Sequence, residues 1–186
     1  MIMKGHEHRV LGSRTIARWT SALAIALVFA APLAAETIDR VLAVVAGQLI
    51  MESDVVGMRE LGFVSPDPGA NPDASVLSKL IDRELMLAEV DRYAPPEPDS
   101  ALVDRQVAAV RARFPSQQAY DAVLSRAGLT QANVREIVRQ NLRLEAYLDE
   151  RFVTQNGDRQ GRQAMIDEWV ADLRRRSPAM DLSTRP

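Results

Sequence analysis

Two short apolar runs around a glycine-containing turn, followed at once by a helix start, constrain the fold more than any other part of the chain. The runs are Val41–Val45 and Leu49–Met51, and residues 46–48 separate them. Runs of this length on both sides of such a turn are typical of a β-hairpin. Directly afterwards, Ser53 is predicted as a helix N-cap, with Asp54 at the positive end of the helix dipole. The expected order is strand, turn, strand, helix.

A basic, then apolar, then small-residue segment precedes the hairpin. Residues 1–18 carry four basic side chains and one acidic one, and Trp19 to Leu33 is uncharged and rich in Ala, Leu, Ile and Val. Ala34 and Ala35 follow. This order is typical of a secretory signal peptide, and the apolar part is shorter than the roughly 20 residues of a membrane span. Residues 1–35 are therefore predicted to be a signal peptide cleaved near Ala35. An uncleaved anchor is the alternative.

Removal of residues 1–35 restricts the catalytic and metal-binding sites that the rest of the chain can form. Both histidines, His6 and His8, lie in that segment, and the chain has no cysteine. The remaining side chains provide no Ser-His-Asp or Cys-His arrangement and no His- or Cys-based zinc site. The sequence also lacks a glycine-rich phosphate-binding loop or dinucleotide fingerprint. We therefore expect no enzymatic activity, no cofactor and no metal.

The charge of the remaining 151 residues is mildly acidic. It comes from 19 basic and 24 acidic side chains, a net charge of about −5. Nucleic acid is not an expected partner, because its phosphates require a basic face. A chain of this length can bury roughly 70% of its unfolded surface. One domain stabilised by hydrophobic packing, without disulfides, is therefore expected.

The chain after the hairpin is predicted to be helical, with breaks at Pro, Gly and polar stretches. The expected helices run from Asp73 or Ser75 to about Tyr93, from Asp99 or Ser100 to Phe114, from Gln117 to Ala127 after Ser116, from Thr130 to about Val153, and from about Met165 to Arg176. Their apolar side chains recur at three- and four-residue spacing, which indicates one buried face per helix. The predicted fold class is mostly α with a small β element: an N-terminal hairpin plus about five to six packed helices. Trp169 is predicted to be a core residue that joins the last helix to the long one.

Four stretches, taken in order, resemble the N-terminal, client-binding domain of SurA-type periplasmic chaperones. They are Leu80–Leu87 (LIDRELML), Arg113–Ser116 (RFPS), Arg139–Leu144 (RQNLRL), and Trp169 with the turn Leu173–Arg176 (LRRR). With the hairpin, the resemblance covers nearly all of residues 36–182. It implies a single domain over 36–186, in which Ala179–Leu182 returns to the hairpin as a third strand.

One departure from that family bears on function. Relatives usually carry one or two parvulin-type prolyl isomerase domains between the long helix and the last helix. Here only a short linker, residues 154–162, is expected at that place, and the histidines typical of a parvulin site are missing. The resemblance therefore implies peptide binding without isomerase activity.

The function that the resemblance implies is that of a periplasmic, ATP-independent holdase. Its partners would be unfolded exported polypeptides or peptides, chiefly outer-membrane-destined ones, with no stable membrane insertion after signal cleavage. The alternative is a non-catalytic adaptor that docks onto a separate isomerase or envelope-assembly machine. The sequence leaves the oligomeric state open.

A holdase needs adaptable apolar side chains, and methionine repacks easily around different partners. The predicted peptide-contacting residues are Met51, Met58, Phe63, Val64 and Met86. Phe63 and Val64 are included because they stand at the start of the proline-rich loop.

Overall fold

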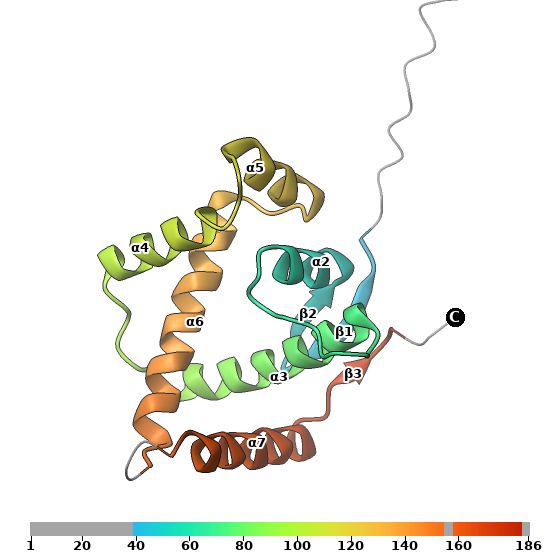
Figure 1. Ribbon diagram of the computed structural model, residues 1–186. Helices are drawn as coiled ribbons and strands as arrows, with labels where there is room; N and C mark the ends of the chain where they lie inside the picture. The colour runs from blue at the N-terminus through green and yellow to red at the C-terminus, as the bar shows by residue number, and fades with distance from the viewer. Residues whose placement is uncertain (1–38, 155–157, 184–186) are drawn as a thin grey trace, which may run out of the picture. The chain divides into compact units, whose positions relative to one another are not determined.

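The computed structural model describes residues 39–154 and 158–183 (Figure 1). The predicted signal peptide lies outside these residues. About 65% of the described part is helical, in six helices. The elements are β1 (Val41–Val45), β2 (Gln48–Met51), α2 (Glu52–Glu60), α3 (Pro72–Tyr93), α4 (Ser100–Arg111), α5 (Gln117–Arg126), α6 (Gln131–Arg151), α7 (Arg159–Arg176) and β3 (Met180–Asp181). The predicted fold class, mostly α with a small β element, is confirmed.

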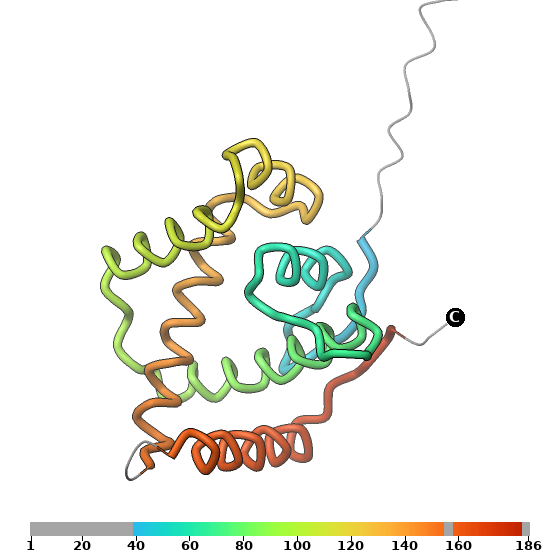
Figure 2. The backbone as a smooth tube through the Cα atoms, in the orientation of Figure 1, coloured from blue at the N-terminus to red at the C-terminus, as the bar shows by residue number. Residues whose placement is uncertain are grey.

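The three strands form one antiparallel sheet in the order β2-β1-β3. Ala46 and Gly47 connect β1 to β2 with φ angles of 49° and 86°. Positive φ at both central residues matches the twist of a two-residue hairpin. The chain returns along α7 to place β3 beside β1 (Figure 2), where the N–H of Leu182 donates to the carbonyl of Leu42 at 2.8 Å. The expected third strand is confirmed.

The start of α2 differs from its prediction. The helix begins at Glu52, and Asp54 accepts the backbone N–H of Met51 at 2.8 Å. Ser53 lies inside the helix, where its backbone N–H and its hydroxyl both donate to Asp39. The predicted Ser53 cap is wrong because β2 runs directly into the helix and leaves no residue between them.

The other helix starts follow local capping chemistry. The side chain of Asn71 caps α3, with Pro72 at the first position, in place of the predicted Asp73 or Ser75. The predicted caps of α4, α5 and α6 are confirmed as Asp99, Ser116 and Thr130. Helix α7 begins at Arg159, inside the predicted linker 154–162, because Asp158 accepts the N–H of Gly161 at 3.0 Å and caps the helix earlier than expected.

Two hydrophobic clusters fill the interior. The hairpin cluster consists of Leu42, Ala43, Val45, Ile50, Val55, Met58, Val76, Leu77, Leu80, Ile81, Leu85, Leu87, Val90, Leu144, Tyr147, Trp169 and Leu173. The α5 cluster consists of Leu61, Val103, Val110, Tyr120, Val123, Leu124, Val134 and Val138. Helix α3 contacts α2, α6, α7 and both strands of the hairpin. It is therefore the element around which the other parts of the hairpin cluster are packed.

Deleting residues 178–186 is expected to destabilise the protein by about 1–3 kcal/mol, because ladder hydrogen bonds of about 0.5–1.5 kcal/mol each are lost. A two-stranded hairpin is marginal by itself, and β1 would lose one of its two partners. Amide hydrogen exchange in Val41–Val45 should become faster. A chain that ends at Ser183 keeps β3 and serves as the control. Unchanged exchange in β1 after the longer deletion would contradict the prediction.

Candidate functional site

A trough lies along β2, between the hairpin, α3 and α6. Two neighbouring cavities form it, and we call it the β2 trough. The cavity beside the hairpin turn has about 260 Å³ and is lined by Ala46, Gln48, Glu84, Leu87, Ala88, Asp91, Arg139, Gln140 and Arg143. The other has about 170 Å³ and is lined by Gln48, Leu49, Ile50, Asp54, Met58, Leu80, Arg83, Glu84, Leu129 and Ile137. Gln48 and Glu84 line both cavities, which are therefore adjacent.

The β2 trough borders β2 along the outer edge of this strand. Successive side chains of a strand point to opposite faces of the sheet. Gln48, Leu49 and Ile50 are consecutive and nevertheless line the same cavity. Since β2 is an outer strand, that cavity borders the row of backbone groups that faces away from β1.

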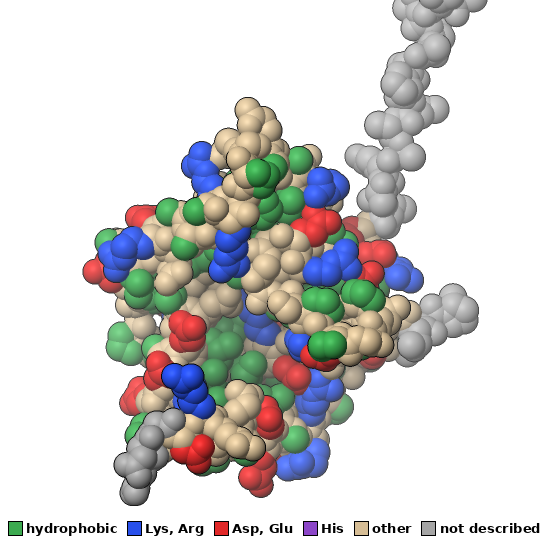
Figure 3. Space-filling model, in the orientation of Figure 1, with side chains coloured by type: hydrophobic (Ala, Val, Ile, Leu, Met, Phe, Trp, Pro, Cys, Tyr) green, Lys and Arg blue, Asp and Glu red, His purple; other side chains and the backbone are tan. Residues whose placement is uncertain are grey.

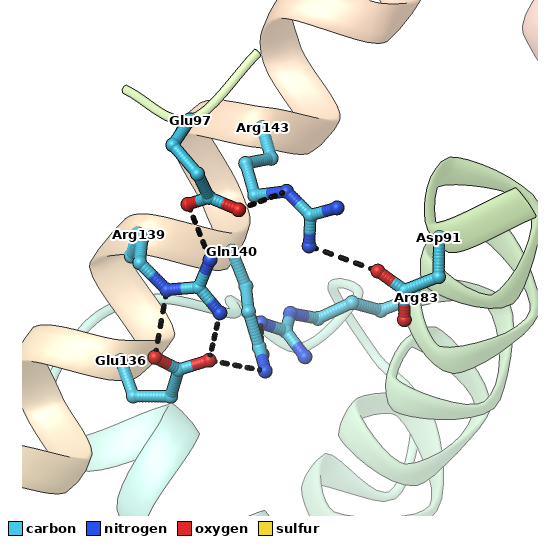
Figure 4. A network of polar contacts seen from close by, with 7 residues as sticks. All are labelled: Arg83, Asp91, Glu97, Glu136, Arg139, Gln140 and Arg143. Atoms are coloured by element: carbon cyan, nitrogen blue, oxygen red, sulfur yellow. Dashed lines mark hydrogen bonds and ion pairs between the residues drawn. The ribbon is translucent and has the colours of Figure 1, made fainter. Parts of the chain in front are cut away.

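A buried arginine, Arg143, lines the cavity beside the hairpin turn, and Figure 4 shows its side chain between those of Glu97 and Asp91. Arg143 of α6 is only 9% exposed, and its Nη1 donates to Asp91 of α3 at 2.8 Å. Its Nε lies 3.4 Å from Glu97 and has no hydrogen-bond partner among the described residues. Glu97, in the segment between α3 and α4, also pairs with Arg139. One carboxylate thus bridges two arginines of α6.

A second set of polar contacts joins α3 to α6 beneath this pair. Arg83 donates to Asn141 at 3.1 Å, to Gln140 at 2.9 Å and to Glu84 at 2.6 Å. The Arg83 side chain is 11% exposed. Because its donors are already engaged in these contacts, Arg83 fixes the distance between the two helices. Arg83 therefore adds no unpaired positive charge to the trough.

Charges of opposite sign nearly cancel around the trough. Hydrogen bonds from Arg139 hold the pKa of Glu136 below its ordinary value, so this carboxylate stays ionised beside the arginine. At the other end, burial raises the pKa of Asp54, although its bond from the Met51 N–H acts in the opposite direction. The trough therefore attracts neither anions nor cations strongly, and Asp54 at its other end is partly buried.

A second candidate surface lies between α3 and α7, and we call it the α3–α7 groove. It has about 500 Å³ and is lined by Lys79, Asp82, Met86, Gln163, Ile166, Asp167, Val170, Ala171 and Arg174. Met86 and Val170, both partly exposed, provide apolar surface together with the 8%-exposed Ile166, and four charged side chains stand around them: Lys79, Asp82, Asp167 and Arg174. Arg174 pairs with Asp82 across the groove and donates to the Ser78 carbonyl at 3.0 Å. The groove is therefore apolar inside and charged at its borders.

The five predicted contact residues do not gather in one place. Met86 lines the α3–α7 groove, and Met58 lines the β2 trough although it is only 5% exposed and belongs to the hairpin cluster. Met51 is partly exposed at the end of β2. Phe63 and Val64 pack partly buried against the hairpin cluster and are not among the residues that line either surface. The surface role predicted for Met58 is thus restricted by its place in the core.

Sequence reasoning missed the polar residues of the trough. Arg139, Gln140 and Arg143 stand at three- and four-residue spacing on α6, which places them on one face. That face also carries Ile137 and Leu144. Polar side chains within an apolar stripe were therefore the one signal in the sequence that could have pointed to these residues. This signal does not reveal that α3 lies opposite them.

Two comparisons with known proteins found no match to this chain. No protein-family model matches the chain, and no curated protein matches it either. Among residues 39–154 and 158–183, no group of three or more His, Cys, Asp or Glu side chains is placed to hold a metal ion. None of the helices in that part combines the length and apolar character of a membrane crossing. The functional proposal therefore rests on the surfaces described above and on the resemblance of sequence.

Proposed function

We propose that the protein is an exported, ATP-independent holdase that binds unfolded, chiefly outer-membrane-destined polypeptides. The observation that carries the proposal is the α3–α7 groove, in which the partly exposed Met86 and Val170 lie among charged side chains. An unfolded chain exposes apolar side chains, and burying them contributes about 25 cal/mol per Å². The flexible Met86 side chain can repack around different side chains. The groove suits many sequences, each bound weakly.

The remaining surface supports the same function. On the face drawn in Figure 3, Lys and Arg side chains are interspersed with Asp and Glu side chains, without a large region of one sign. A mixed charged surface keeps a protein soluble when it carries an apolar client. Release follows from weak affinity, without a nucleotide-driven step.

The resemblance to SurA-type chaperones supports the proposal from the sequence side. In this interpretation residues 1–35 direct export to the periplasm, and residues 36–186 form one client-binding module. The short connection between α6 and α7 takes the place of an isomerase domain. The Met86 side chain belongs both to the Leu80–Leu87 stretch that carries the resemblance and to the groove.

The test is suppression of aggregation by the protein that starts at Glu36. A few-fold molar excess should delay the light scattering of a denatured outer-membrane protein without nucleotide. Ala171→Asp should remove most of the delay, because this exposed residue lines the groove. Ala164→Asp is the matched control, since Ala164 is exposed on the same helix outside the groove lining. Prolyl isomerisation of a test peptide should stay uncatalysed, with a time scale of tens to hundreds of seconds.

One outcome would count against the holdase, and another against the groove as its binding surface. No delay for several clients would remove it, and one stoichiometric partner in pull-downs would then favour the adaptor function. Equal loss of activity in Ala171→Asp and Ala164→Asp would show that the α3–α7 groove is not the binding surface.

A further inference from the structure

We propose that the β2 trough is a separate binding site for an extended, uncharged polypeptide segment, which adds to β2 as a further strand. The site differs from the α3–α7 groove in position and in chemistry. The groove recognises apolar side chains, whereas the trough offers a strand edge. The inference does not depend on the holdase function.

The backbone of Leu49 provides the edge. In the antiparallel ladder, Gln48 is opposite Val45 and Ile50 is opposite Ala43. The pair that closes a two-residue hairpin exchanges hydrogen bonds, and such pairs alternate with non-bonded ones. Gln48 and Ile50 therefore bond to β1, and the N–H and C=O of Leu49 point away from it. Leu49 is 58% exposed and lines the 170 Å³ cavity, so this outer edge of β2 borders open space.

The walls of the trough suit one extended chain. A new strand lies about 4.7–4.9 Å from its neighbour, whereas a helix with side chains is about 10–12 Å wide. Residues Gln48–Met51 span about 13 Å at 3.3 Å per residue, enough for about four residues of ligand. Ile137 of α6 forms the opposite side of the 170 Å³ cavity. Cavities of about 260 and 170 Å³ along a strand edge suit one extended chain better than a helix of that width.

The side chains around the trough define the ligand further. Leu129 and Ile137, both partly exposed, offer an apolar site for one side chain of the ligand. At the other end the exposed amide of Gln48 can pair with a peptide group. The arginines and carboxylates there are paired with each other, so a charged segment gains nothing. The geometry therefore favours apolar or hydroxyl side chains on an extended backbone.

An uncovered strand edge is a liability that proteins usually block with lysine, proline or a covering element. β2 contains neither lysine nor proline, and its outward residue is Leu49. Residues of α6 line both cavities beside this edge. A strand edge that borders a cavity in this way is the arrangement expected of a site for a single strand.

The test uses the protein from Glu36 and a fluorescent, end-blocked ten-residue peptide of alternating Val and Thr, with binding measured by anisotropy. Methylating alternate backbone nitrogens on one edge of the peptide should weaken binding at least about tenfold, because it removes the donors for strand addition. Leu49→Pro should weaken binding by a similar factor, since it removes the outward N–H and leaves the ladder donors of Gln48 and Ile50. Leu49→Thr keeps that N–H and should change binding by less than about threefold.

The methylated peptides keep the test decisive if Leu49→Pro fails to fold. Equal affinity of methylated and unmethylated peptides would overturn the proposal. Binding that Ala171→Asp abolishes and methylation does not would place the peptide in the α3–α7 groove, and would also overturn it. Sedimentation that shows a dimer dissolved by Leu49→Pro would assign the edge to a second copy. Aggregation assays report separately on the holdase function.

Discussion

Replacing Trp169 by alanine is expected to lower the free energy of unfolding by about 3–5 kcal/mol, the usual cost of truncating a buried tryptophan. Trp169 of α7 is 8% exposed and lies in the hairpin cluster. Its ring centroid is 5.8 Å from that of Tyr147 and 5.4 Å from that of Phe152 at the end of α6. The substitution therefore loses both apolar burial and two aromatic contacts.

The consequence is large because domains are stable by only about 5–15 kcal/mol. Urea denaturation followed by circular dichroism measures the change. Met165→Ala is the control, because Met165 is on the same helix and 39% exposed, and it should cost well under the tryptophan value. Coincident denaturation curves for wild type and Trp169→Ala would show that α7 does not depend on this residue for its packing.

Replacing Tyr120 by alanine is expected to destabilise the α5 cluster by a similar amount, about 3–5 kcal/mol. Tyr120 is fully buried, and its ring lies 5.4 Å from Phe114. Its hydroxyl donates to Gln131 at 3.0 Å, and burial raises the pKa of this hydroxyl above its ordinary value. The residue joins α5 to the first turn of α6.

Tyr120→Phe removes the hydroxyl and keeps the ring, so it separates their contributions to stability. It should cost only about 0.5–1.5 kcal/mol, the net contribution of one hydrogen bond. The same denaturation measurement applies to both variants. A phenylalanine variant as unstable as the alanine variant would mean that the bond to Gln131, and not the packing of the ring, holds α5 in place.

Helix boundaries and the hairpin could be predicted because they depend on neighbours in the chain. The caps Asp99, Ser116 and Thr130 bond to N–H groups two or three residues further on. Apolar periodicity likewise identified Trp169 as a core residue, since the buried face of a helix recurs within a few residues. The Ser53 cap was mispredicted because β2 runs directly into α2, so that Ser53 lies inside the helix, where it bonds to Asp39, 14 residues away.

The candidate site depended on distant pairings. Arg143 meets Asp91, 52 residues earlier, and Arg83 meets Asn141, 58 residues later. No local pattern states which face of α6 is opposite α3. The space left between them is set by how the hairpin cluster and the α5 cluster pack. Predicted contact residues such as Phe63 and Val64 were chosen by type and loop position, and neither criterion contains that information.

The sequence by itself determined which segments become helix or strand, because those choices depend on hydrogen bonds and periodicity within one or two turns. The resemblance of the sequence to a known family also implied that a third strand follows the last helix. Only the tertiary structure decided that β3 joins β1 and not β2. Either pairing satisfies the backbone of β3 equally well, and the path of α7 beside α3 selects one of them. That selection leaves the edge of β2 open toward α6, where the trough lies.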